Sequence, residues 1–305
     1  MNITRTITGV DDSGQPAKVV VTTTEPEAQL DTAHPEMLVG ITCDPAQYTT
    51  RLAHWPAARM TRIFGYPGKG IPPWKATKND ARTATVRRLC PDVIPHVSFK
   101  DWPTDRDAER MVHAWLDQLP TPSPMPDLLG GPPLVMVSHM HEPGPKDFPP
   151  AEYRRRQFLL GCWLAAHPNG HLVELVHIDA NIWVEDKGGR DLSIYLPGAG
   201  IPSCDTYARS WKPYPTVDQL LWAPLTLAAA TGQAPFLPEF AIAKRPDDPT
   251  GQRRADLVVT CVIKLRSEGC RGVSWWDDLG TGGTDFRLDD QPSRAAWADA
   301  MAGRI

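Results

Sequence analysis

Several features that mark common classes of protein are missing from this sequence. It contains no block of lysines and arginines, and its formal net charge is −4, which argues against a nucleic acid as partner. The longest apolar stretch covers residues 220–230 and is too short to span a bilayer. The first residues contain no apolar segment of the kind found in secretion signals. We therefore expect no nucleic-acid partner, no membrane span and no signal peptide.

Signatures of metals and cofactors are equally scarce. The six cysteines form no CxxC pair and do not cluster with histidines, so a zinc site is not expected. We expect buried, reduced thiols, with a Cys261–Cys270 disulfide as the alternative. The first apolar run is not followed by a glycine-rich phosphate loop, because residues 40–45 read GITCDP. The sequence accordingly predicts a protein with no metal and no cofactor.

A regular series of short apolar runs begins at residue 37. The eight runs cover residues 37–42, 59–64, 93–99, 134–140, 172–178, 192–196, 234–237 and 272–276. Buried strands that alternate with helices are typical of α/β proteins. Eight such units over about 270 residues match the count and length of a (β/α)8 TIM barrel. An open doubly wound sheet would need the missing phosphate loop, so the predicted fold class is α/β, a (β/α)8 barrel.

Helix signals separate most of these runs. Thr104 is a candidate N-cap for one helix, and Pro149-Pro150 opens a second. A third helix is predicted to start at Thr216 and to stop at Gly232, and a fourth to run from Gln252 to Ser267. Each lies between two predicted strands, as a (β/α)8 barrel requires.

The N-terminal region differs from the rest of the chain. Strand-like runs at residues 3–10 and 18–24 flank the turn-forming cluster 11–16. We interpret residues 1–34 as a β-hairpin extension with a linker, and residues 35–305 as the barrel. The extension is a candidate docking surface for an assembly partner.

Two glutamates stand where predicted strands end. Glu142 follows the fourth apolar run, and Glu239 follows the seventh. Functional sites of such barrels lie at the C-terminal ends of the strands. Alternation puts Met140 and Glu142 on one face of strand four, and Leu237 and Glu239 on one face of strand seven, so both carboxylates should reach the same mouth. Paired carboxylates can divide the acid and base roles that cleavage of a glycosidic bond requires.

This pattern resembles the retaining glycoside hydrolases of the large (β/α)8 clan that carries catalytic glutamates after strands 4 and 7. Within that clan it is most similar to glycoside hydrolase family 26, the β-mannanase-like group. The motifs that carry the resemblance are residues 61–64 (TRIF), 141–143 (HEP), 195–198 (YLPG), 205–207 (DTY), 238–240 (PEF) and 273–277 (VSWWD). They span about residues 37–300. The commonest signature of the clan has Asn before the acid/base glutamate, and His141 at that position fits family 26.

The resemblance assigns roles to the two carboxylates. Glu142 would be the general acid/base and must stay protonated near neutral pH, and Glu239 would be the nucleophile. Retention of configuration requires the two carboxyl groups to lie about 5–5.5 Å apart. Arg62 and Tyr207 would hold Glu239, and His141 would orient the acid/base.

Aromatic and acidic residues complete the predicted site. Trp275 or Trp276 would form the floor of a sugar subsite, and Trp102 is a further candidate for contact with substrate. Asp205 is expected to be structural, and Asp277 is expected to be a loop charge.

The predicted function is a retaining β-glycoside hydrolase that cleaves a polysaccharide or oligosaccharide by double displacement. The alternative is a glycan-binding or structural barrel attached to a larger assembly, such as a phage tail, with little or no turnover. The extension at residues 1–34 and the missing secretion signal motivate this alternative, and they would fit a cytoplasmic or virion-associated protein. The presence of Glu142, Glu239 and Arg62 together favours the enzyme, because a barrel that only binds glycans does not need all three. Mannan, xylan, mixed-linkage glucan and galactan all remain open as substrates.

Overall fold

The structure is a computed structural model that describes residues 2–10, 16–24, 36–120, 133–141, 148–179, 200–209 and 213–305. For residues 2–10, 16–24, 178, 179 and 281 only the backbone is described. The predicted acid/base Glu142 lies outside the described residues.

Short parallel strands form the centre of the molecule. They are β3 (Leu38–Thr42), β4 (Met60–Phe64), β5 (Ile94–Phe99), β6 (Val135–His139), β7 (Val173–Asp179), β8 (Ile201–Cys204), β9 (Thr206–Ala208), β10 (Phe236–Ile242) and β11 (Gly272–Trp276). One arc has the order β4-β5-β6-β7-β8 and the other has the order β3-β11-β10-β9. The arcs meet at Asp205, which separates β8 from β9, and at a hydrogen bond from the Arg59 N–H to the Val39 carbonyl (3.0 Å). The strands therefore close into a barrel.

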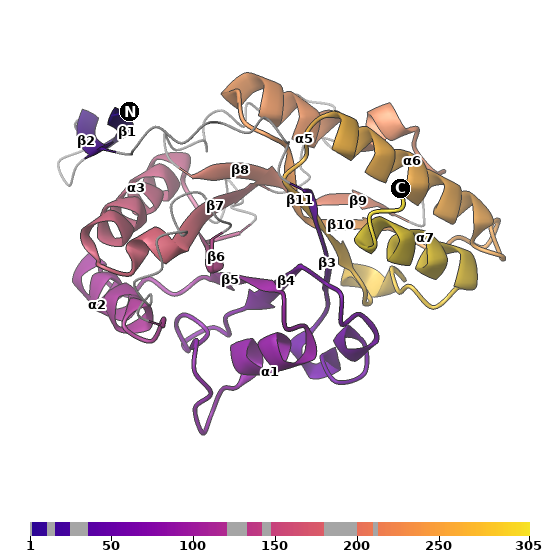
Figure 1. The fold of residues 1–305 in the computed structure, drawn as a ribbon, viewed down its shortest axis with the longest axis horizontal. Helices are drawn as coiled ribbons and strands as arrows, with labels where there is room; N and C mark the ends of the chain where they lie inside the picture. The colour runs from indigo at the N-terminus through magenta and orange to yellow at the C-terminus, as the bar shows by residue number, and fades with distance from the viewer. Residues whose placement is uncertain are drawn as a thin grey trace.

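Helices surround these strands (Figure 1). They are α1 (Arg82–Leu89), α2 (Asp105–Leu116), α3 (Pro150–Ala166), α5 (Val217–Thr231), α6 (Gln252–Ser267) and α7 (Gln291–Met301). Between β3 and β4 two short 3-10 turns, at residues 45–47 and 52–54, take the place of a long helix. An outer layer of helices over a parallel barrel is the architecture predicted from the alternating runs.

The capping chemistry explains the predicted helix boundaries. The Thr104 hydroxyl accepts a hydrogen bond from the Asp107 N–H at 3.1 Å, which starts α2. Thr216 and Gln219 form a reciprocal capping box at the start of α5. Gly232 ends α5 with a φ of +65°, a conformation that glycine adopts without strain. The four predicted helices are confirmed, whereas α1 and α7 were not predicted.

The sixth barrel strand is not where the sequence predicts it. Residues 192–196 lie outside the described residues, and the sixth position is occupied by β8 and β9. Asp205 interrupts this strand, so that β8 pairs with β7 and β9 pairs with β10. The seventh strand also differs, because β10 continues to Ile242 and places Glu239 inside the strand rather than beyond its end.

A β-bulge in β10 corrects the predicted side-chain alternation. Leu237 lies opposite Val273 and Phe240 lies opposite Trp275, so three steps along β10 match two steps along β11. The extra residue falls around Pro238, which has no N–H to donate to the ladder. Leu237 and Glu239 therefore do not share a face as strict alternation predicts. Bulges of this kind re-aim side chains near functional sites.

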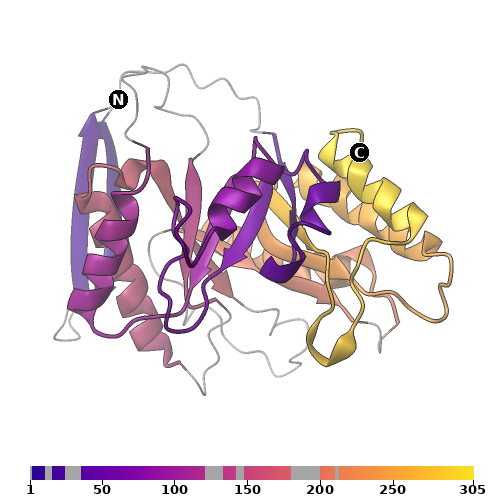
Figure 2. The ribbon, with the colours of Figure 1, turned by 90° about the horizontal axis from the view of Figure 1, so that it is seen from below.

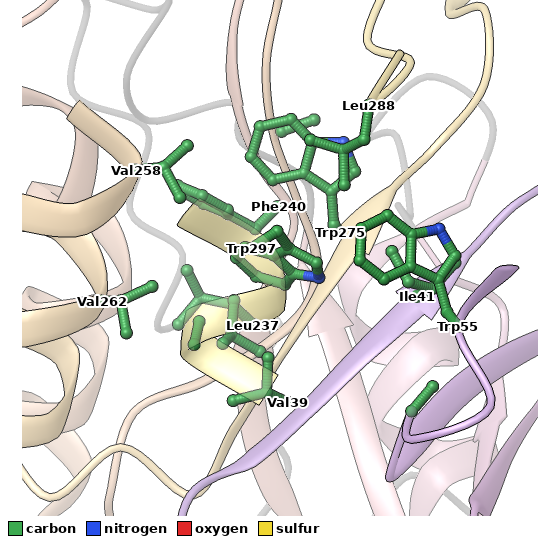
Figure 3. Packing of buried hydrophobic residues seen from close by; sticks show 14 of the residues in the cluster. Val39, Ile41, Trp55, Leu237, Phe240, Val258, Val262, Trp275, Leu288 and Trp297 are labelled. Carbon is green, nitrogen blue, oxygen red and sulfur yellow. The ribbon is translucent and has the colours of Figure 1, made fainter. Parts of the chain in front are cut away.

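Two apolar layers hold the barrel together. Inside it, one residue from each of seven strands forms a cluster: Leu38, Met60, Ile94, Met136, Val176, Ile201 and Phe236. Outside it, a larger cluster packs the strands against α6 and α7, as Figure 3 shows for Leu237, Phe240, Val258, Val262 and Trp297. The alternative disulfide is wrong, because Cys261 and Cys270 are both thiols within this packed region.

The first two strands stand apart from the barrel. β1 (Asn2–Val10) and β2 (Pro16–Thr24) pair antiparallel, and β1 lies beside α3 (Figure 2). The division of the chain at residue 34 stays a prediction. None of the described helices is long and apolar enough to cross a membrane.

Candidate active site

A buried arginine connects two acidic side chains at the C-terminal end of the barrel. Arg62 on β4 has 0% side-chain exposure. Its Nη1 donates to Asp205 Oδ2 at 3.0 Å and also to Glu239 Oε1. A guanidinium withdrawn from water needs such partners, because burying an unpaired charge is costly. Arg62 is therefore bound by two carboxylates from neighbouring positions of the barrel, the sixth strand and β10.

The backbone around Arg62 is tied to the neighbouring strands. The Arg62 N–H donates to Thr42 Oγ1 at 3.1 Å, and the Thr42 and Ser274 hydroxyls are 2.7 Å apart. These contacts connect β3, β4 and β11 just below the mouth of the barrel. They restrict the direction in which the guanidinium can point.

Glu239 accepts hydrogen bonds on both carboxylate oxygens. Arg62 donates to Oε1, and the Tyr207 hydroxyl donates to Oε2. Tyr207 lies on β9 beside β10, and its ring packs against Phe286 with 5.3 Å between centroids. The Glu239 side chain is 9% exposed, so it is largely but not fully withdrawn from solvent. A cationic donor and a hydroxyl donor together fix its orientation and stabilise its charged form.

Two histidines near Arg62 are neutral. The Nε2 atom of His96 lies 2.6 Å from the Ser138 hydroxyl, and Nδ1 of His141 lies 2.9 Å from the Ser98 hydroxyl. Burial, and after it the Arg62 charge, lowers the pKa of both imidazoles well below the ordinary value. Both rings therefore act as neutral hydrogen-bonding groups rather than as cations.

His141 connects strand four to the same mouth. Its ring lies 5.5 Å from the Phe64 ring, and the Arg62 guanidinium carbon lies 4.9 Å from the Phe64 centroid. The preceding residue, Met140, has a φ of +55°, which is uncommon for a residue other than glycine and often marks functional sites. His141, the residue directly before Glu142, is thus close to Phe64 and Arg62. The distance between the Glu142 and Glu239 carboxyl groups stays a prediction.

The two adjacent tryptophans of β11 have different surroundings. Trp275 is 0% exposed, donates its Nε1–H to the Phe286 carbonyl at 2.8 Å and packs against Trp297 (Figure 3). Its predicted role as a subsite floor is therefore wrong. Trp276 points the other way, and its ring lies 5.8 Å from Phe64. Of the two, Trp276 is the one that the strand presents to the mouth.

Trp102 is not brought together with Arg62 and Glu239. Its ring stacks on Trp163 of α3 with 5.0 Å between centroids, and its Nε1–H donates to Asp105 at 2.7 Å. The ring of His139 lies 4.6 Å away. These contacts place Trp102 in the layer between the strands and α3.

Two aspartates make contacts that the sequence does not indicate. Asp205 pairs with Arg62, so it belongs to the site, and its position between two short strand segments gave no signal of this contact. Asp277 is buried rather than a loop charge. It accepts from Arg51 Nη1 at 3.1 Å and from the Leu288 N–H at 2.7 Å, and burial raises its pKa. Within the described part of the chain, no group of three His, Cys, Asp or Glu residues is arranged to hold a metal.

Comparison with known proteins adds the following findings. No family model and no curated protein sequence matches this chain. Among solved structures, the catalytic domain of a GH26 endo-β-1,4-mannanase from Bacillus sp. JAMB-750 is similar, with 13% identity, a TM-score of 0.58, and coverage of 89% of this chain and 87% of that chain. A Bacteroidetes-affiliated GH5 cellulase has 12% identity, a TM-score of 0.54, and coverage of 90% and 94%.

A third similar structure is a GH128 oligosaccharide-binding protein from Trichoderma gamsii. It has 13% identity, a TM-score of 0.50, and coverage of 92% of this chain and 99% of that chain. At these identities the similarity concerns the fold. The chain has the (β/α)8 barrel fold of the glycoside hydrolases that its sequence resembles, as predicted.

Proposed function

We propose that this protein is a retaining β-glycoside hydrolase whose nucleophile is Glu239 and whose acid/base is Glu142. The observation that carries the proposal is the hold on Glu239, whose two oxygens accept from Arg62 and Tyr207. A nucleophilic carboxylate must be charged and must be aimed at one carbon atom. A cation on one oxygen and a hydroxyl on the other meet both needs.

The proposed reaction has two steps. In the first, a Glu239 oxygen bonds to the anomeric carbon while the glycosidic bond breaks, and Glu142 gives its proton to the leaving oxygen. In the second, Glu142 takes a proton from water, which attacks the anomeric carbon and releases Glu239. The position of His141 near Phe64 and Arg62 supports this pairing, because Glu142 is the next residue.

The substrate class is a β-linked polysaccharide or oligosaccharide. The similar structures include an endo-β-1,4-mannanase and a cellulase, which supports a β-linked glycan without choosing a sugar. The aromatic rings of Phe64 and Trp276 lie beside each other at the mouth near Arg62 and are suited to contact a pyranose ring.

The second candidate is a barrel that binds glycans without cleaving them. It is favoured by the similarity to an oligosaccharide-binding GH128 protein. The proposed attachment to a larger assembly through residues 1–34 has no further support and stays a hypothesis. The two candidates differ in turnover, so an assay of glycan cleavage by the wild type separates them.

The test is release of reducing sugar from mannan, xylan, mixed-linkage glucan and galactan. We expect the wild type to cleave at least one of these glycans. Glu239→Gln should lose this activity but should still bind the glycan, as measured by calorimetry. Glu174→Gln is the matched control, because Glu174 is also a barrel-strand glutamate paired with an arginine, Arg271, but stands near the other end of its strand. Binding by the wild type without turnover of any glycan would favour the second candidate.

A second variant tests Glu142. Glu142→Ala should retain the first step on a dinitrophenyl β-glycoside, because that leaving group needs no proton, and azide should restore the second step by replacing water. If azide has no effect and activity on the dinitrophenyl glycoside falls as far as activity on the glycan, Glu142 is not the acid/base.

A further inference from the structure

We propose that Asp205 is the permanent counter-ion of Arg62, a positioning residue that allows Glu239 to lose its negative charge when it bonds to the sugar. This inference rests on the proposed function, since it concerns the covalent step of that reaction. It assigns a role to a residue that the sequence suggested to be structural.

The geometry makes Arg62 a bridge between the two carboxylates. The same nitrogen, Nη1, donates to Asp205 Oδ2 at 3.0 Å and to Glu239 Oε1. The side chains of Arg62 and Asp205 are both 0% exposed, whereas Glu239 keeps 9% of its side chain exposed. Asp205 is thus the inner partner, and Glu239 is the partner that faces the mouth.

The charges change during the reaction. Before it, one cation and two carboxylates give the trio a net charge of −1. When a Glu239 oxygen bonds to the anomeric carbon and the glycosidic bond breaks, Glu239 becomes a neutral ester. Arg62 stays charged and fully buried, and a buried cation without a counter-ion is strongly unfavourable. The Asp205 carboxylate leaves the trio neutral at that stage.

The other described groups beside Arg62 and Glu239 do not supply this charge. Glu142 becomes a carboxylate in the same step, but it lies outside the described residues. Tyr207 offers a neutral hydroxyl to Glu239. His96 on β5 and His141 after β6 are neutral, because burial and Arg62 lower the pKa of both. The described titratable groups around Arg62 therefore leave Asp205 as the group that carries a negative charge throughout the reaction.

The fold supports this placement of Asp205. It is the single residue between β8 and β9, where the sixth barrel strand changes from pairing with β7 to pairing with β10. A break at one residue lets the carboxylate face into the barrel, while Cys204 and Ala208 pack in apolar clusters.

The experiment compares variants that separate charge from size. Asp205→Asn keeps the size and removes the charge, and Asp205→Glu keeps the charge and adds a methylene. The probes are dinitrophenyl β-glycosides and their fluorosugar counterparts, which trap the glycosyl-enzyme and allow its formation to be followed by intact mass. The sugar is the one that the wild type cleaves.

If Asp205 acts through its charge, Asp205→Asn should form the trapped intermediate at least about 100-fold more slowly than the wild type. The acid limb of its kcat/KM profile should move to lower pH by about one unit or more, because loss of a neighbouring negative charge favours ionisation of Glu239. In Asp205→Glu the acid limb of the kcat/KM profile should stay at the pH of the wild type. A structural role would give the reverse order, with Asn tolerated and Glu damaging.

Asp290→Asn is the matched control. Asp290 Oδ2 accepts from Nη1 of Arg254 at 2.9 Å, and the Arg254 side chain is also 0% exposed, but this pair lies at the start of α7. Its replacement should leave the labelling rate unchanged. If circular dichroism shows Asp205→Asn to be unfolded, Asp205→Glu and Asp205→Gln, which have equal size and differ in charge, replace it in the comparison.

Two outcomes would overturn the inference, and they are distinguishable. In the first outcome, the wild type is labelled, and Asp205→Asn is labelled at a rate within about threefold of it and has the same acid limb in its kcat/KM profile. Asp205 is then not the counter-ion, and the proposed function stands. If the wild type is neither labelled nor active on any probe, the proposed function itself fails.

Discussion

Leu237 and Phe240 both point into the layer between the barrel and the helices, although they are three residues apart on the same strand (Figure 3). A regular strand would turn them to opposite faces. The bulge between them restores the phase of the strand and directs Glu239 toward Arg62. The orientation of the proposed nucleophile therefore depends on one extra residue in β10.

This relationship predicts the stability of two variants. Leu237 and Phe240 are both 0% exposed, so Leu237→Ala should lower the free energy of unfolding by about 2–5 kcal/mol and Phe240→Ala by about 3–5 kcal/mol. Urea unfolding measures both, with the exposed Trp222→Ala as control. A decrease in the free energy of unfolding of less than about 1 kcal/mol for either variant would mean that its side chain is not packed between the barrel and the helices.

The parts of the fold that sequence could predict are those with a strong local signal. Continuous apolar runs located β3, β4, β5, β6 and β11 closely, and caps located α2 and α5. The sixth strand was misplaced because Ile201-Pro202-Ser203-Cys204 is short and partly polar, and Asp205 interrupts it. Helix α1 was missed because its sequence, RTATVRRL, has few apolar residues.

The site divides in the same way. Arg62, Glu239 and Tyr207 lie on motifs that could be compared with a known family, and the structure brings them together. Contacts that depend on closure of the barrel could not be predicted, because Arg62 and Asp205 are 143 positions apart. Nor could adjacent tryptophans be told apart, since the packing of α7 against β11 decides which of the two rings is buried.

Tyr207→Phe should impair the proposed catalysis while keeping the fold. It removes the hydrogen bond to Glu239 Oε2, and a hydrogen bond to a charged group contributes about 1.5–3 kcal/mol. We expect kcat/KM to fall roughly 10- to 150-fold. Tyr214→Phe is the matched control, because the Tyr214 hydroxyl donates to the Ala243 carbonyl (3.2 Å) and to Asp248 (3.3 Å). Equal losses in the two variants would show that the effect of Tyr207 is structural.

Trp275 and Trp276 should respond differently to truncation. Trp275→Ala leaves a cavity beside Trp297 and should lower the free energy of unfolding by about 3–5 kcal/mol. Trp276→Ala should cost much less stability and should raise KM for the glycan, because this ring faces the mouth beside Phe64. Thermal unfolding and steady-state kinetics on both variants check this. A rise in KM confined to Trp275→Ala would reverse the assignment.

Acid should destabilise the protein before its salt bridges begin to titrate. Burial lowers the pKa of His139 and His177 to about 3, whereas a histidine in an unfolded chain titrates near 6.5. Between these values the unfolded chain binds protons that the folded chain excludes. Stability should therefore be constant above about pH 6.5 and should fall below it, by up to about 1.4 kcal/mol per pH unit for each such histidine.

The measurement is the thermal unfolding midpoint from about pH 7.5 to about pH 5, an interval in which paired carboxylates stay ionised. His139→Leu removes one titrating group and should make the fall shallower than in the wild type. His171→Leu replaces an exposed histidine and should leave the slope unchanged. A midpoint that stays constant down to pH 5 in the wild type would mean that water or charge reaches these imidazoles in the folded protein, and that the interior behind β5, β6 and β7 is less closed than its packing indicates.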